Sequence, residues 1–270
     1  MARKKIAFKL ALLVSSIVCT LLNTMDVHAR TSPTSPATQS ETSEFSCIYP
    51  ASYEERVMCR NIGDQILAVT IRIEMHADYA FGQSHATVVG GRYLVTHNHF
   101  SYSLTEIAAG DGEGYTGVSL RTANGTLLIE NAPLSTYTVV HQDAETLVLD
   151  FGIGIGKGKL AAMGLASAKV TNWTMVKWNA GMEIAHIDWN GETAHVDWTL
   201  VEVVATDGGT AHIQVNNYAM KGASGGGAYW NGQHVGNIWA RNLEKDANTG
   251  EVTRLYTLIA LNAINVGELD

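Results

Sequence analysis

The chain has 270 residues, of which 46% are hydrophobic and 16% are charged, and its formal net charge is −8. This length and apolar content allow a sizeable core and exclude a disordered or collagen-like chain. The acidic balance argues against a protein that binds nucleic acid or lies on an anionic membrane, and three cysteines are too few for a disulfide-dense scaffold or a four-cysteine zinc site.

Residues 1–29 have the layout of a signal peptide. Residues 3–5 form a basic start, and the uncharged apolar run Leu10–Leu22 that follows is shorter than the roughly 20 residues of a membrane-spanning helix. The small residues of Val27-His28-Ala29 predict cleavage after Ala29. We therefore expect a mature chain that is secreted or extracytoplasmic (cell envelope), with an uncleaved N-terminal anchor as the alternative.

Residues 30–45 are rich in Ser, Thr and Pro and predict a flexible linker before a folded body at 46–270. Cys47 and Cys59 are the two cysteines beyond the signal peptide. In the oxidising compartment that export implies, we expect them to form a disulfide bond; two separate buried thiols are the alternative.

The body predicts short strands and few helices. Apolar and β-branched runs bounded by Gly or Asn indicate strands at Ile66–Ile73, His85–Val89, Tyr93–Thr96, Val118–Arg121 and Thr126–Ile129. Asn190-Gly191 indicates a hairpin between Ile184–Trp189 and Ala194–Val204, whose arms carry the near-repeat Ala-His-Ile-Asp-Trp and Ala-His-Val-Asp-Trp. Only Leu258–Leu269 has a helical pattern. The sequence therefore predicts an all-β barrel or sandwich.

Three segments carry residues suited to nucleophilic acyl transfer, in the order His, acid, Ser. A β-run leads to His99, an acidic segment containing Asp143 and Glu145 leads into an apolar strand, and Ser224 lies among glycines. This chemistry needs an exposed serine, a histidine to take its proton and an acid to orient that histidine. Glycines around the serine let backbone N–H groups face a developing oxyanion.

These segments resemble a known family. Gly222–Gly226 resembles the Gly-x-Ser-Gly-Gly motif of chymotrypsin-like (trypsin-like) serine peptidases, Tyr93–His99 resembles that family's segment ending in Thr-x-x-His, and Ala228–Gly236 is similar to the hairpin after its serine. The resemblance covers about residues 64–266. It implies peptide-bond hydrolysis through an acyl-enzyme, in the cleft between two packed antiparallel six-stranded β-barrels with a short C-terminal helix. The expected barrels span about 62–151 and 165–257.

Carried over by position, the resemblance makes Ser224 the nucleophile and His99 the general base. The N–H groups of Gly222 and Ser224 would form the oxyanion hole. The same register makes Glu145 the orienting acid. Asp143, two residues earlier and on the same face of an extended strand, is the alternative.

Several positions depart from the family pattern. Ala223 replaces the Asp of zymogen-activated members, so we expect no activation by insertion of a new N-terminus. Gly227 replaces a usual Pro, and His97-Asn98 replaces small residues before the histidine. Tyr218 stands where an Asp would favour cleavage after Lys or Arg. Arg241 either reaches the pocket wall and favours an acidic side chain or faces outward at the surface.

Two other motifs are considered as a metal site and a phosphate-binding loop. His97 and His99 have alternate-strand spacing, and a metal site would need a further ligand from His76, His85 or His141, but no pattern fixes one. Gly152–Lys159 looks like a phosphate loop but fits neither glycine fingerprint, so we expect the loop that joins the two barrels. We therefore expect no metal and no cofactor.

The sequence favours a secreted serine endopeptidase that acts on a protein or peptide substrate. A catalytically inactive secreted β-barrel binding module on the same scaffold is the alternative. The enzyme is favoured because a binding module does not need a serine in the nucleophile motif together with a histidine at the matching place. We expect no nucleic-acid partner and no membrane contact after signal cleavage; the oligomeric state stays open.

Overall fold

The computed structural model describes residues 45–77, 81–98, 115–132, 136–154, 156–207, 210–262 and 264. The predicted signal peptide and all but the last residue of the predicted linker lie outside the described residues. No helix of the described chain has the length and apolar character needed to cross a membrane.

The described chain begins with a helix, α1 (Tyr53–Ala68). Ser52 caps it, because its side chain accepts a hydrogen bond from the N–H of Glu55 at 3.0 Å. The predicted disulfide bond between Cys47 and Cys59 is confirmed and ties the preceding segment to the helix. The predicted strand at Ile66–Ile73 is wrong in its first half, since residues 66–68 form the last helical turn. The apolar run continues from helix into strand, so hydrophobicity does not mark the junction.

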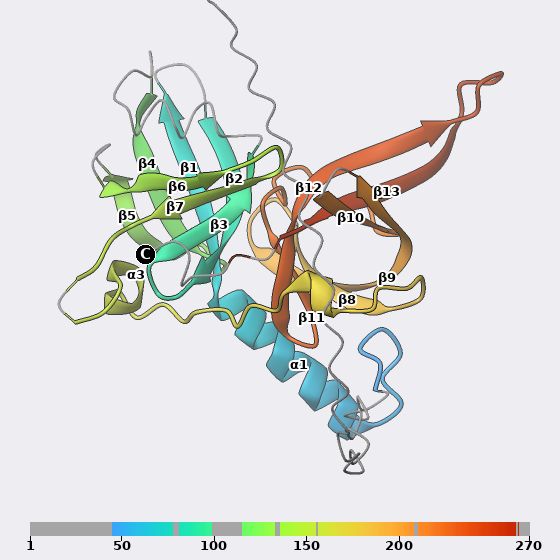
Figure 1. The fold of residues 1–270 in the computed structure, drawn as a ribbon, viewed down its shortest axis with the longest axis horizontal. Coiled ribbons are helices and arrows are strands. Elements are labelled where there is room, and N and C mark those ends of the chain that lie inside the picture. Colours follow the sequence, from blue (N-terminus) through green and yellow to red (C-terminus); the bar gives the residue numbers. More distant parts are fainter. Residues whose placement is uncertain are drawn as a thin grey trace, which may run out of the picture. The chain divides into compact units, whose positions relative to one another are not determined.

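The first half of the body is an antiparallel sheet with the strand order β5-β4-β1-β2-β3-β7-β6 (Figure 1). Its strands are β1 (Thr70–Ala77), β2 (Phe81–Val89), β3 (Tyr93–His97), β4 (Tyr115–Thr122), β5 (Leu127–Ala132), β6 (Thr138–Gln142) and β7 (Thr146–Asp150). It has seven strands among the described residues, whereas the resemblance implied six. Its core is mostly aliphatic and includes Ile71, Leu94, Leu120 and Leu147.

Two short helices, α3 (Lys159–Ala162) and the 3₁₀-helix η3 (Trp173–Met175), lie in the segment that leads to the second half. That half is a closed six-stranded barrel with the order β10-β13-β12-β11-β8-β9. Its strands are β8 (Glu183–Trp189), β9 (Ala194–Asp207), β10 (Thr210–Val215), β11 (Gly227–Trp230), β12 (Gln233–Lys245) and β13 (Val252–Leu261). Figure 1 shows β12 and β13 continuing beyond the barrel as a long hairpin.

The predicted hairpin around Asn190-Gly191 is confirmed, with β8 and β9 as its arms. The predicted C-terminal helix is wrong over Leu258–Leu261, which belong to β13, and its remaining residues, apart from Asn262 and Ile264, lie outside the described part. Leu258 pairs with residues on both neighbouring strands, Gln214 and Ala240. A strand enclosed in this way reads as a continuous apolar run, which periodicity does not separate from a helix.

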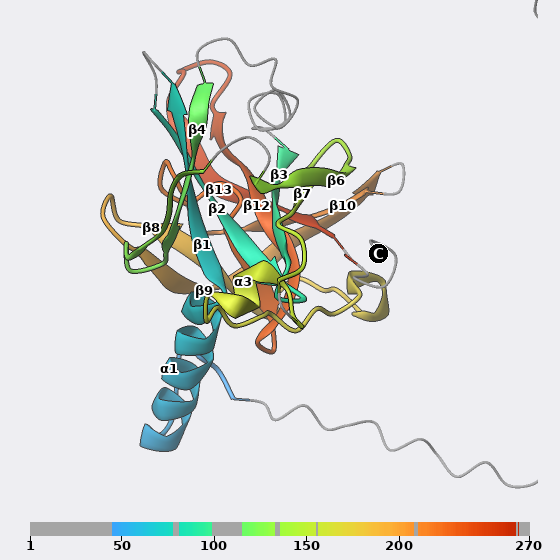
Figure 2. The same cartoon turned by 90° about the vertical axis from the view of Figure 1, so that its left-hand side faces the viewer.

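Buried amides join the barrel to the N-terminal sheet. The side-chain amide of Asn237 in β12 donates to the carbonyl oxygens of Gly225, at 2.7 Å, and Val95, at 3.3 Å. Asn262 donates to the side-chain oxygen of Asn237 at 3.0 Å and to the Thr146 hydroxyl at 3.3 Å. Figure 2 shows β12 running close to β3, in agreement with these contacts. The network therefore holds together the strands that flank the predicted site.

Candidate active site

Ser224 lies in the turn between β10 and β11, and its side chain is partly exposed. The turn requires glycine at two places: Gly222 has φ +108° and Gly225 has φ +77°, a region that disfavours side chains. Ala223 between them is fully buried in the barrel core, and its N–H donates to the carbonyl of Met220 at 3.1 Å. The turn thus buries the residues beside the serine and leaves the serine itself accessible.

Strand β2 holds the backbone of Ser224 in place. The Ser224 carbonyl accepts hydrogen bonds from the N–H of His85, at 2.8 Å, and from the hydroxyl of Ser84, at 2.9 Å. Thr96 of β3 donates to the carbonyl of His85 at 2.7 Å. A Cβ atom at Gly225 would lie 2.2 Å from both the His85 carbonyl oxygen and the Thr96 hydroxyl oxygen. Only glycine therefore lets the serine turn approach the N-terminal sheet this closely.

His85 also contacts Gly222, one of the predicted oxyanion-hole residues. Its Nδ1 lies 2.7 Å from the Gly222 carbonyl oxygen, and since a carbonyl only accepts, Nδ1 carries the proton. Burial lowers the pKa of His85 to about 4, so the ring is neutral at pH 7. The sequence offered His85 only as a metal ligand; here it orients the peptide unit that links Gly222 to Ala223.

Glu145 immediately precedes β7, is only 8% exposed, and forms an ion pair with His212 of β10 through Oε1. Burial raises the pKa of the Glu145 carboxyl; His212 opposes the rise, and the nearby charge of Asp143 adds to it. The His212 ring stacks on Trp239 with 5.3 Å between the ring centroids. Sequence reasoning missed His212, because its contact with Glu145 joins two sheets and no local residue spacing predicts such a contact.

Asp143, the alternative acid, occupies a different environment. Its Oδ1 accepts the N–H groups of Glu145, at 2.8 Å, and Thr146, at 2.6 Å, while Oδ2 lies 3.2 Å from His141 Nε2. The residue is exposed, and its carboxylate shapes the turn that enters β7. Asp143 thus has a local structural use that Glu145 does not have.

His99 lies outside the described residues, so its side chain is not placed. The chain just before it is placed: the N–H of Asn98 donates to the carbonyl of Glu145 at 2.7 Å. His97 in β3 pairs with Thr146 in β7. The described segment 81–98 therefore ends beside Glu145, one residue before the predicted general base.

Tyr218 and Arg241, which the sequence raised as candidates for specificity, lie together near the serine turn. The guanidinium of Arg241 lies 5.1 Å from the centroid of the Tyr218 ring and 3.5 Å from the carbonyl oxygen of Ala219. Arg241 is exposed, as the surface alternative expected, but it lies along the segment that leads to Ser224. A positive charge is thus present on this side of the turn.

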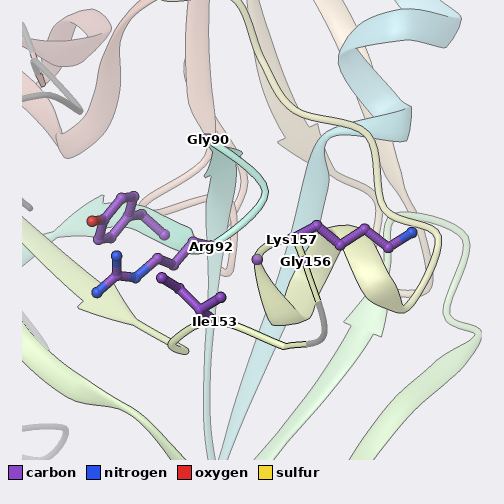
Figure 3. A pocket seen from close by; sticks show the side chains of 7 residues that line it. Gly90, Arg92, Ile153, Gly156 and Lys157 are labelled. Atoms are coloured by element: carbon purple, nitrogen blue, oxygen red, sulfur yellow. The ribbon is translucent and has the colours of Figure 1, made fainter.

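Part of the glycine-rich segment, namely Ile153 and residues 156–158, lines a separate depression of about 590 Å³ with Gly90, Arg92 and Tyr93 (Figure 3). Arg92 does not present a free cation there, because Asp150 accepts two hydrogen bonds from its guanidinium, at 2.6 and 2.7 Å. A Cβ atom at Gly158 would lie 2.2 Å from the carbonyl oxygen of Gly91. Close packing of two turns therefore explains this glycine without a phosphate ligand.

No family model matches the sequence, and no curated protein matches it. Among solved structures, the fold is similar to Deg5, with 16% identity and a TM-score of 0.52 over 70% of this chain and 87% of Deg5. It is also similar to the HtrA-type protease AlgW in complex with a tripeptide, with 13% identity and a TM-score of 0.50. That match covers 74% of this chain but only 58% of AlgW. The chain has the fold of trypsin-like serine proteases.

Proposed function

We propose that this protein is a secreted serine endopeptidase that cleaves peptide bonds through an acyl-enzyme on Ser224. The observation that carries the proposal is the serine turn: two positive-φ glycines present Ser224, and β2 holds its carbonyl at 2.8 Å. The trypsin-like protease fold supports the same chemistry. A binding module would not require this constraint on one serine.

In the proposed reaction, the Ser224 oxygen attacks the peptide carbonyl carbon while His99 takes the hydroxyl proton. The N–H groups of Gly222 and Ser224 stabilise the oxyanion that forms. The C–N bond then breaks as His99 returns the proton to the leaving amine. Water, activated by His99, hydrolyses the acyl ester and restores the serine.

Glu145 is the proposed acid that orients His99. The backbone bond from Asn98 brings the chain before His99 beside Glu145, and the ion pair with His212 uses Oε1, which leaves Oε2 for the His99 imidazole. His212 is then a positioning residue that fixes the carboxylate. Asp143 is less suited, because backbone N–H groups and His141 already occupy both of its oxygens.

The substrate class and the compartment belong to the proposal as well. AlgW binds a tripeptide in its solved structure, and a protein or peptide substrate is proposed here by analogy. The disulfide between Cys47 and Cys59 supports export, since such bonds persist in oxidising compartments.

An organophosphonate that phosphonylates only activated serines tests the proposal. We expect intact-mass spectrometry to show one adduct on the natural chain and none on Ser224→Ala or His99→Ala. Ser167→Ala is the matched control, because Ser167 is exposed and lies outside the serine turn. A folded chain that takes up no adduct over a range of pH would refute the peptidase and favour the inactive binding module.

A further inference from the structure

The β8–β9 hairpin gathers four titratable side chains on one face. His186 lies directly opposite Asp197, and Asp188 lies directly opposite His195. Because side chains alternate along a strand, residues 186 and 188 share a face, as do 195 and 197. The near-repeat of Ala-His-x-Asp-Trp, which the sequence explained as hairpin similarity, therefore creates a square of two imidazoles and two carboxylates.

Three members of this square are close enough to share an ion. One ligand atom each from Asp188, His195 and Asp197 lies within 4.8 Å of those of the other two. His195 Nε2 is 3.4 Å from Asp197 Oδ1. Tetrahedral zinc with bonds of about 2.0–2.1 Å separates neighbouring ligand atoms by about 3.3 Å, so this pair already has the required spacing.

The protein fixes one oxygen of each carboxylate and leaves the other available. Asp188 Oδ1 accepts the N–H groups of Trp189, at 2.7 Å, and Met220, at 2.8 Å. Asp197 Oδ2 accepts the side-chain amide of Asn217 at 2.7 Å. Outer hydrogen bonds of this kind orient the ligands of protein metal sites.

The charges of the cluster are not balanced by the protein. Within the part of the chain that the structure describes, no Lys or Arg pairs with Asp188 or Asp197, and Asp188 is only 5% exposed. Two carboxylates this close repel each other where water is partly excluded. A bound cation would relieve that repulsion.

His186 provides a second observation that points to a ligand at this cluster. It is fully buried, its Nδ1 donates to the carbonyl of Ile187 at 3.2 Å, and its Nε2 has no hydrogen-bond partner among the described residues. Because His186 lies directly opposite Asp197 and shares a face with Asp188, its ring lies beside the cluster. An unpaired, buried acceptor next to two carboxylates fits a metal-bound water molecule.

We propose that Asp188, His195 and Asp197 bind one divalent cation of the Zn²⁺ type, with water in the fourth position near His186. One imidazole and two carboxylates suit a borderline metal better than Ca²⁺ or Mg²⁺. The site links the hairpin to residues 217–220, which Asn217 and Met220 attach to Asp197 and Asp188. The ion would thus brace the segment that leads to Ser224. This proposal differs from the sequence analysis, which predicted no metal site.

Isothermal titration calorimetry tests the proposal by measuring Zn²⁺ binding to the full chain carrying Ser224→Ala. We expect one equivalent of Zn²⁺ to bind and the melting temperature to rise with its concentration. His195→Ala and Asp197→Ala should weaken binding about 100-fold or more, and Asn217→Ala, which removes an orienting bond, about tenfold. Both ligands are partly exposed, so these variants should fold, which near-ultraviolet circular dichroism checks.

Two control variants each replace a histidine outside the proposed metal site. His141→Ala removes a His–Asp pair to which the described residues add no third ligand, and His99→Ala removes the predicted catalytic base. Both should bind Zn²⁺ as tightly as the parent chain. The proposal is wrong if no Zn²⁺ binds, if binding survives in His195→Ala and Asp197→Ala, or if a control abolishes it. Because binding is measured directly, the result does not depend on whether the chain is a peptidase.

Discussion

Replacing Gly225 by alanine should destabilise the protein far more than the same change at Gly250. Both residues have a positive φ, +77° and +72°, so alanine meets the same backbone penalty at either place, about 1 kcal/mol. They differ in their surroundings. A Cβ atom at Gly250 has no atom within 4 Å, whereas at Gly225 it lies 2.2 Å from the oxygens of His85 and Thr96.

The atoms that a Cβ at Gly225 would contact cannot easily move away. The His85 carbonyl belongs to the backbone of β2, and moving it would disturb the hydrogen bond from the His85 N–H to Ser224. Overpacking of this kind typically costs about 1–3 kcal/mol or more, beyond the backbone penalty. We therefore expect Gly225→Ala to lose at least about 2 kcal/mol more unfolding free energy than Gly250→Ala.

Urea denaturation, followed by tryptophan fluorescence, measures both variants in a Ser224→Ala chain to prevent self-cleavage. With a denaturant slope of about 2–3 kcal/mol per molar, the two midpoints should differ by close to 1 M. Phosphonate labelling of Gly225→Ala, made in the chain with Ser224 intact, should fall as well. Midpoints that agree within the equivalent of about 0.5 kcal/mol would refute the close approach of the serine turn to β2 and β3.

Three further predictions concern buried polar groups. Asn237→Ala should lower the unfolding free energy by about 2–4 kcal/mol, because it removes hydrogen bonds to two buried carbonyls and one from the Asn262 amide. Urea midpoints measure this loss against the exposed Asn248→Ala, which should change little. His212→Ala should slow phosphonate labelling and shift its pH profile. His212→Gln keeps a hydrogen-bond donor for Glu145 and should restore part of the labelling rate. Equal rates in the natural chain and both variants would exclude a positioning role for His212. His85 and His234 have pKa values lowered to about 4 by burial, against 6.5 unperturbed, so the unfolded chain binds protons first as pH falls. The stability present above pH 6.5 should therefore decline down to about pH 4, by roughly 3 kcal/mol for each histidine, and a flat urea midpoint over this range would contradict their burial.

The sequence predicts well what local patterns determine. The Asn-Gly turn of the β8–β9 hairpin, the glycines around Ser224 and the pairing of Cys47 with Cys59 all depend on residues close in the chain or on the compartment. The strands at 85–89 and 93–96 follow for the same reason.

The errors arise where burial on all sides removes periodicity. Residues 66–68 and 258–261 are both apolar runs, yet the first ends a helix and the second lies in a strand. Ser52 and Glu55 at the start of α1 have the spacing of a helix cap, and this signal could have identified the helix. The contact between Glu145 and His212 lies between two sheets, so no local pattern could reveal it.

The hydrogen bonds from β2 to Ser224 determine when the proposed activity can begin. They join residues 140 positions apart, from Ser84 to Ser224, and Asn237 reaches Val95 across 142. Neither half of the chain alone can hold the serine turn. A nascent chain would therefore carry the serine without its support, and the proposed reactivity would appear only after the two halves dock. On the proposed function, two separately expressed halves should regain phosphonate labelling only when mixed.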